Sequence, residues 1–199
     1  MNSNQSLEGA QIANHVAVAV DHMRDGRDAF TSRLGIANAN SAPGVSFNSN
    51  QQTLVSSILD LFAGHPSKEK FALWTDDALF TDPLTIAQGR KQYEAQWYGL
   101  AQAFSTIETQ SHEVTSAGNP IVMNLRNKYT VKGIGKETTI QSVVNIYTVG
   151  EGEAQRIEKV EDKWDGKLPE GGIANAFRRL NAVTVPHVVS VPKDGEKEN

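Results

Sequence analysis

The sequence predicts an α+β fold in which helices pack against one curved sheet. Residues 51–104 place apolar side chains at helical spacing, with one short extended stretch among them. From Ser105 onward, apolar and polar residues alternate with a period of two, and Gly- and Asn-containing turns separate the extended segments. A group of helices followed by a run of strands favours helices on a mainly antiparallel sheet over alternating strand–helix units.

The chain has 199 residues, which suits one domain with extensions. We expect four parts: an N-terminal helical arm and linker over 1–50, the main domain over 51–165, a C-terminal helix and extended segment over 166–192, and a disordered tail over 193–199. The arm is predicted from a helical pattern over Leu7–Leu34, which is followed by a linker rich in Asn, Ser and Gly. Disorder of this first part is the alternative.

Three helices and one short strand are predicted in the first half of the domain. Asn50 is a candidate N-cap for a helix that Gly64 closes, and Ser67 caps a second, short helix after Pro66. The next residues, 75–78, form a polar turn, and 78–81 form a strand that Asp82-Pro83 ends, because proline restricts the preceding residue to extended geometry. A third helix over 90–104 shows a strong apolar stripe.

Four longer strands are predicted in the second half. They cover residues 106–115, 121–131, 138–149 and 155–164. The third of them is apolar on both faces at its centre and is therefore placed inside the sheet. A last helix begins near Ile173 and stops before Pro186, and residues 188–191 form a short extended apolar piece.

Composition excludes several classes of function. The formal net charge of −4 gives no indication of a nucleic-acid or an anionic-membrane partner. The absence of cysteine excludes disulfides and thiol catalysis. No apolar run reaches the roughly 18 residues that span a bilayer. No spacing of His, Asp and Glu suggests a metal site, and no motif calls for a cofactor. A cytoplasmic, soluble protein is the default expectation.

Asp82 is the sharpest chemical candidate. A carboxylate at the end of a strand, fixed by Pro83, is well placed to face a cavity, where burial and a fixed orientation would suit a general base. The alternative is a turn in which Asp82 accepts hydrogen bonds from backbone N–H groups.

Asp162 is the second candidate. It shares a strand face with Val160 and Trp164, and an ionisable group on an apolar face is costly unless it is paired. It is therefore either a second pocket acid or the partner of Arg126, Arg156 or Lys159 in a salt bridge.

The stretch from Trp74 to Pro83, together with Gly89, Arg90 and Tyr93, resembles the nuclear-transport-factor-2-like (NTF2-like) superfamily, especially its SnoaL-like and ketosteroid-isomerase-like branch. The resemblance covers about residues 51–165. It implies a conical fold, a curved mixed or antiparallel sheet wrapped around three helices, with an apolar pocket open at one end. Homodimers are common in such families, so a homodimer is expected.

The resemblance also implies roles for three positions. Asp82 matches the carboxylate that shuttles a proton in the isomerase members. The tyrosine donor of those enzymes falls on Ile58, which cannot donate, and their protonated aspartate falls near Asn145, which can. The missing tyrosine argues against ketosteroid-type isomerisation.

Two functions follow as hypotheses, and the sequence leaves open whether the protein is an enzyme. In the first, the pocket binds a small apolar molecule and performs cofactor-free isomerisation, cyclisation or dehydration, with Asp82 as base and Asn145 or a tyrosine as donor. In the second, the protein is a non-catalytic binding or dimerisation module. Besides the acids, the expected lining residues are Ile58, Phe62, Trp74, Phe80, Tyr93, Trp97, Tyr129, Tyr147 and Trp164. Core packing is the alternative role for the aromatic residues among them.

Overall fold

The computed structural model describes residues 39–166 and 175–177. The predicted N-terminal helix, the extended piece 188–191 and the tail 193–199 lie outside the described residues, as does most of the predicted C-terminal helix. Within the described part no helix is long and apolar enough to span a bilayer.

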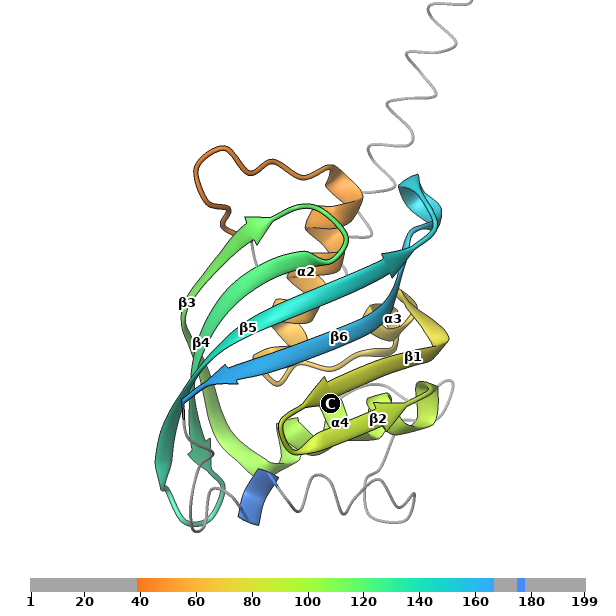
Figure 1. The fold of residues 1–199 in the computed structure, drawn as a ribbon. Helices are drawn as coiled ribbons and strands as arrows, with labels where there is room; N and C mark the ends of the chain where they lie inside the picture. The colour runs from red at the N-terminus through yellow and green to blue at the C-terminus, as the bar shows by residue number, and fades with distance from the viewer. Residues whose placement is uncertain (1–38, 167–174, 178–199) are drawn as a thin grey trace, which may run out of the picture. The chain divides into compact units, whose positions relative to one another are not determined.

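One mixed sheet of six strands, in the order β2-β1-β6-β5-β4-β3, forms the centre of the fold (Figure 1). Neighbouring strands are antiparallel except for β1 and β6, which run parallel. The strands are β1 Trp74–Asp82, β2 Thr85–Gln88, β3 Phe104–Ser116, β4 Ile121–Val131, β5 Glu137–Val149 and β6 Arg156–Asp165. A short 3-10 helix, η1 (Gly152–Ala154), lies in the β5–β6 connection. The α+β prediction and the four long strands are confirmed.

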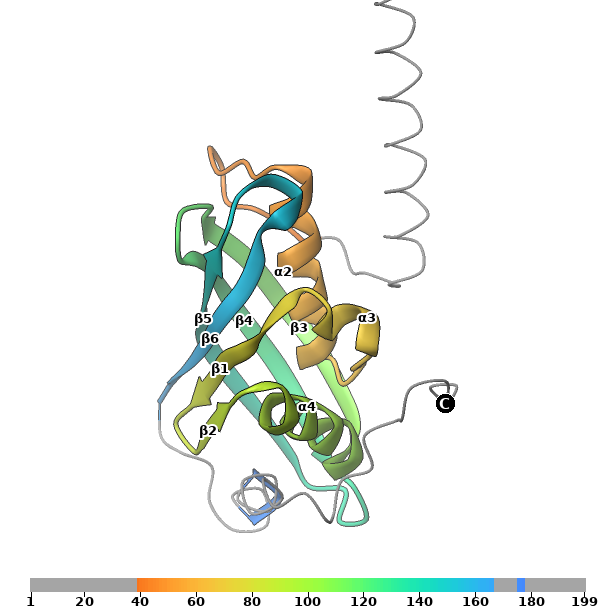
Figure 2. The same cartoon turned by 90° about the vertical axis from the view of Figure 1, so that its right-hand side faces the viewer.

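Three helices pack on one side of this sheet: α2 (Ser49–Phe62), α3 (Lys68–Phe71) and α4 (Arg90–Ala103) (Figure 2). The N-cap of α2 is Asn48 instead of Asn50, because Asn48 and Gln51 form a reciprocal capping box. Ser67 caps α3 as predicted, and its hydroxyl accepts a hydrogen bond from the Lys70 amide.

Two parts of the prediction for 75–88 are wrong. Residues 75–77 belong to β1 and do not form a turn, and Thr85–Gln88 forms an additional strand, β2, paired with the end of β1. The local preference of these residues for a turn is overridden because β1 pairs with β6, which is distant in the sequence. The pairing shifts register between Trp74 and Leu79, and the exposed Asp76 and Asp77 lie within that interval.

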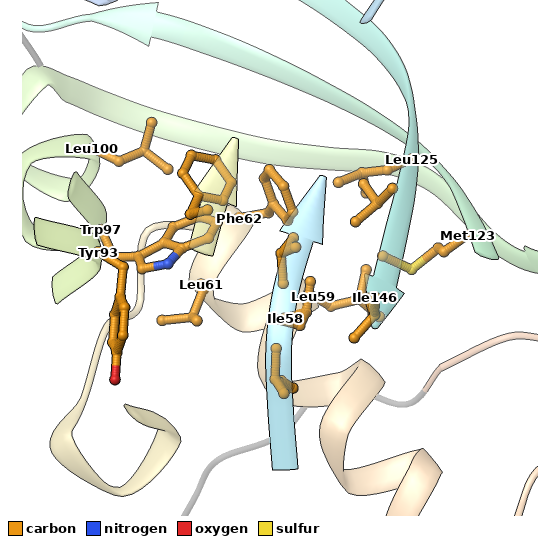
Figure 3. Close-up of a cluster of buried hydrophobic side chains, with 14 of the residues drawn as sticks. Ile58, Leu59, Leu61, Phe62, Tyr93, Trp97, Leu100, Met123, Leu125 and Ile146 are labelled. Atoms are coloured by element: carbon orange, nitrogen blue, oxygen red, sulfur yellow. The ribbon is translucent and has the colours of Figure 1, made fainter. Parts of the chain in front are cut away.

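The core lies between the helices and the concave face of the sheet. Strand β4 alternates as predicted: Ile121, Met123 and Leu125 are buried, and the residues between them are partly or fully exposed. Figure 3 shows Met123 and Leu125 of this strand in one cluster with side chains of α2 and α4. Within that cluster, Phe62 of α2 packs edge-on against Trp97 of α4, with 5.0 Å between ring centroids.

A buried ion pair joins the first two helices. Lys70 Nζ of α3 lies 3.2 Å from Asp60 Oδ2 of α2, and it also donates a hydrogen bond to the His65 carbonyl at 2.8 Å. Each of the two charged side chains is 7% exposed. The short helix is thereby fixed at the start of β1.

Candidate functional site

A small cavity lies where β1, β4 and β6 face α2 and α4. Its volume is about 20 Å³, which is room for about one water molecule. The residues around it are Phe62, Phe80, Asp82, Gln96, Trp97, Leu100, Tyr129, Asp162, Trp164 and Phe177. Seven of the twelve side chains that the sequence proposed as site residues therefore line one cavity: Phe62, Phe80, Asp82, Trp97, Tyr129, Asp162 and Trp164.

Asp82 combines both of the roles that the sequence allowed. It is the last residue of β1, and its Oδ1 accepts a hydrogen bond from the Leu84 amide at 2.7 Å, while the side chain also borders the cavity. Burial raises the pKa of the Asp82 carboxyl above its ordinary value, although hydrogen bonds from Leu84 and Thr85 act in the opposite direction. Asp82 is thus an oriented, partly desolvated carboxylate.

Asp162 is more deeply buried, with 6% of its surface exposed. Its Oδ2 accepts a hydrogen bond from the Trp164 indole at 2.7 Å, whereas Oδ1 meets no donor at hydrogen-bonding geometry among the described residues. Burial raises the pKa of Asp162 to about 7, and the negative charge of Asp82 adds to this effect, while Ser142 and Trp164 oppose it.

The salt bridge that the sequence offered Asp162 as an alternative is absent from the part of the chain that the structure describes. Arg126 donates to Gln110, Arg156 donates to two backbone carbonyls, and Lys159 pairs with Glu161. Asp162 therefore lines the cavity without a cationic partner from these three residues.

Tyr129 supplies a neutral hydroxyl to the same cavity. Its ring is buried on β4, and its oxygen accepts a weak hydrogen bond from the Asn127 side-chain amide at 3.4 Å. Burial raises the pKa of the Tyr129 phenol above its ordinary value, and the nearby Asp162 charge reinforces the shift. The hydroxyl hydrogen is thus retained and is available to a ligand oxygen.

The expected places of Asn145 and Tyr147 in the pocket are corrected by the structure, because both side chains face the opposite side of the sheet. In the pairing of β5 with β6, Val144 stands opposite Asp162 and Asn145 stands opposite Glu161, so Asn145 points away from the cavity. The side chains of Asn145 and Tyr147 each donate to Glu161 Oε2 at 3.4 Å. Neither residue can act as the donor in this cavity.

The expectation that Ile58, Trp74 and Tyr93 line the pocket is also corrected, because all three belong to the core and none borders the cavity. Ile58 is fully buried, and Tyr93 stacks on Trp74 with 4.9 Å between ring centroids. The Tyr93 hydroxyl donates to the Thr75 carbonyl at 3.2 Å. Their packing role is the alternative that the sequence already offered for the aromatic residues.

Sequence reasoning missed Gln96, Leu100 and Phe177 as cavity residues. Gln96 is 5% exposed; its amide nitrogen lies 3.4 Å from the Thr85 hydroxyl, and its Oε1 has no hydrogen-bond partner among the described residues. Helical spacing gave a usable signal, because positions 93, 96 and 100 share one face of α4 and Gln96 is the polar one.

Phe177 reaches the cavity from a short helical piece, 175–177, and packs against three aromatic rings. Its ring centroid lies 5.1 Å from those of Phe104 and Trp164 and 5.6 Å from that of Tyr129. No local pattern could place this contact, because the rings that Phe177 meets belong to strands that are distant in the sequence. Phe177 thereby forms one wall of the cavity.

The chemistry available here is that of carboxyl groups, a phenol and an amide in an aromatic cavity. The described residues contain no cluster of three His, Asp or Glu side chains that would hold a metal ion. The homodimer and the compartment stay predictions.

Comparisons with known proteins agree with this fold. A family model described as the SnoaL-like domain matches residues 55–157, more than half of the 199 residues. An NTF2-like protein from Anabaena variabilis is 16% identical, with a TM-score of 0.51 over 62% of this chain and 96% of that one. No curated protein matches the sequence.

Two further solved structures are more distant. A hexachlorocyclohexane dehydrochlorinase from Novosphingobium barchaimii is 11% identical, with a TM-score of 0.49 over 62% of this chain and 90% of that one. A protein of unknown function from Mycobacterium tuberculosis is 12% identical, with a TM-score of 0.49 over 67% and 91% of the two chains. The family match shows that this protein belongs to the SnoaL-like domain family, and its fold is that of the NTF2-like protein from Anabaena variabilis.

Proposed function

We propose that this protein binds a small, mostly apolar molecule in the aromatic cavity and removes a proton from it, with Asp82 as the base and Tyr129 as the hydrogen-bond donor. The observation behind this proposal is that the Asp82 carboxylate and the neutral Tyr129 hydroxyl border the same buried cavity. A base and a donor that face one ligand from two strands are the minimum equipment for forming an enolate.

The proposed step balances without a cofactor. Asp82 takes a proton from the carbon next to a ligand carbonyl, and the C–H electron pair becomes part of a carbon–carbon double bond. The carbonyl oxygen gains the negative charge, which the Tyr129 hydroxyl stabilises by donating a hydrogen bond. Return of the proton from Asp82 to another carbon completes an isomerisation; cyclisation and dehydration can begin with the same enolate.

The experiment is hydrogen–deuterium exchange at carbon, which requires no knowledge of the natural substrate. Cyclohexanone and 2-cyclohexen-1-one are incubated with the protein in D₂O, and loss of the α-proton signal is followed by NMR. We expect exchange above the protein-free rate, and its loss in Asp82→Asn. Asp77→Asn is the matched control, because Asp77 lies on the same strand but is exposed. Exchange that survives in Asp82→Asn would disprove the assigned base.

The size of the cavity favours one alternative, a non-catalytic binding module. A volume of about 20 Å³ is too small for either ketone unless the Phe177 ring moves, and Asp82 is already hydrogen-bonded to the Leu84 amide. The same assay is therefore repeated with Phe177→Ala, which enlarges the cavity. Ketone binding without exchange, in both the natural chain and this variant, would support the binding module over the enzyme.

A further inference from the structure

The proton transfer proposed above leaves the most deeply buried cavity acid, Asp162, without a role. Asp162 Oδ1 and Gln96 Oε1 are both buried, border the same cavity and meet no donor at hydrogen-bonding geometry in the described part of the chain. Both atoms are acceptors. The Ser142 hydroxyl lies close enough to Asp162 to lower its pKa but forms no well-aligned hydrogen bond with it. A buried acceptor left without a donor is costly, so a ligand that brings N–H groups would be favoured here.

Two buried donors on the cavity wall have no acceptor among the described residues: the Trp97 indole N–H, and the Tyr129 hydroxyl, which accepts a hydrogen bond from Asn127 but donates none. Neither donates to Asp162 Oδ1, which itself meets no donor at hydrogen-bonding geometry there.

The wall of the cavity carries two carboxyl groups, and no basic side chain of the described residues lies beside them. Asp82 and Asp162 both border the cavity, whereas no Lys, Arg or His does so among residues 39–166 and 175–177. Two desolvated carboxyls close enough for the charge of Asp82 to affect Asp162 gain most from a positive charge placed between them.

The remaining wall suits the same kind of ligand. Six aromatic side chains surround the two acids: Phe62, Phe80, Trp97, Tyr129, Trp164 and Phe177. The face of an aromatic ring attracts an organic cation, and the attraction is larger where water is excluded.

We infer that the cavity recognises a small organic ammonium ion, whose N–H groups donate to Asp162 and Gln96 and whose apolar body lies among the aromatic rings. This inference rests on the proposed binding of a small molecule, and it makes Asp162 the anchor of the ligand while Asp82 remains the base. A volume of about 20 Å³ fits an ammonium head group alone, so the body of the ligand requires the Phe177 ring to turn aside.

The test compares three probes of similar shape, benzylamine, benzyl alcohol and benzoate, by NMR titration at pH 8, where the amine is protonated. We expect benzylamine to bind at least about 10-fold more tightly than benzyl alcohol, since it adds a charge-assisted hydrogen bond, and benzoate to bind most weakly. Asp162→Asn should remove the preference for the amine. Asp165→Asn, an exposed change on the same strand, is the matched control and should retain it. A circular dichroism spectrum of each variant verifies folding.

Two outcomes would overturn the inference while leaving the proposed binding function intact. The first is equal affinity for benzylamine and benzyl alcohol. The second is a preference for benzylamine that persists unchanged in Asp162→Asn. If no probe binds to the natural chain or to Phe177→Ala, the proposed binding function fails as well.

The pH dependence provides a second readout. Affinity for benzylamine should rise between pH 6 and pH 8, because Asp162 loses its proton over this range, with Asp82 and Tyr129 as the other titratable groups on the cavity wall. A ligand that accepts a hydrogen bond from protonated Asp162 would show the opposite trend, and that result would also overturn the inference.

Discussion

We expect the free energy of unfolding of Asp162→Asn, compared with that of the natural chain at the same pH, to rise as the pH rises. Burial raises the pKa of Asp162 from 3.8 to about 7, so the folded state holds a proton that the unfolded state releases. The stability that the natural chain loses through ionisation of Asp162 is zero below about pH 4, grows as the pH rises, and reaches its full value above about pH 7. Asparagine has no such titration.

The magnitude follows from the two pKa values. Their difference corresponds to about 4 kcal/mol of lost stability once Asp162 is ionised, at about 1.36 kcal/mol for each pH unit. Part of this loss is already present at pH 5. Between pH 5 and pH 8, the free energy of unfolding of the natural chain should therefore fall by about 3 kcal/mol relative to Asp162→Asn.

Urea unfolding at pH 5, 6, 7 and 8 measures this difference, and comparing slopes with pH cancels any constant effect of the substitution on packing. Asp82, whose pKa is also raised, contributes in the same direction to both proteins. Asp165→Asn should follow the natural chain at every pH. Parallel profiles for Asp162→Asn and the natural chain, within about 0.5 kcal/mol, would show that Asp162 is not held in the environment described here.

Three further predictions concern the surroundings of the cavity. Phe177→Ala should lower the free energy of unfolding by up to about 3–5 kcal/mol by removing a ring that contacts three others, as urea unfolding would show; an unchanged value would mean that the ring is not packed there. Lys70→Met should cost about 3–5 kcal/mol, because it removes the buried charge beside Asp60, and the same measurement would contradict this if the loss were below about 1 kcal/mol. Asn145→Ala should leave ketone exchange unchanged while Tyr129→Phe slows it about 100-fold, and the reverse order would refute the assignment of the cavity face.

Sequence periodicity predicted the elements whose stability depends on their own amphipathic pattern. The strand 121–131 was predicted with its observed limits, because its buried and exposed residues alternate throughout. The strand β2 was missed, since its four residues give too short a pattern, and it pairs only with the end of β1.

The same period explains which of the proposed side chains face the cavity. Asp162 was placed on the apolar face from its neighbours Val160 and Trp164, a local argument that a two-residue repeat makes reliable. Asn145 was placed by comparison with a family over many residues, and an error of one residue in a strand moves a side chain to the opposite face. Phe177 could not be found locally, because its contacts join segments that are distant in sequence.

The cost of burying Asp162 is itself an argument about function. A valine or asparagine at this position would avoid ionising a carboxyl that no described cation neutralises, so packing alone gives no reason for an acid. Active and binding sites are where such groups are found, because a ligand can supply the missing partner. A ligand bearing the complementary charge would recover part of the lost stability when it binds, and this gain would add to its affinity. Asp82, fixed by the Leu84 amide, does not show the same deficit, which is why the two acids are assigned different roles.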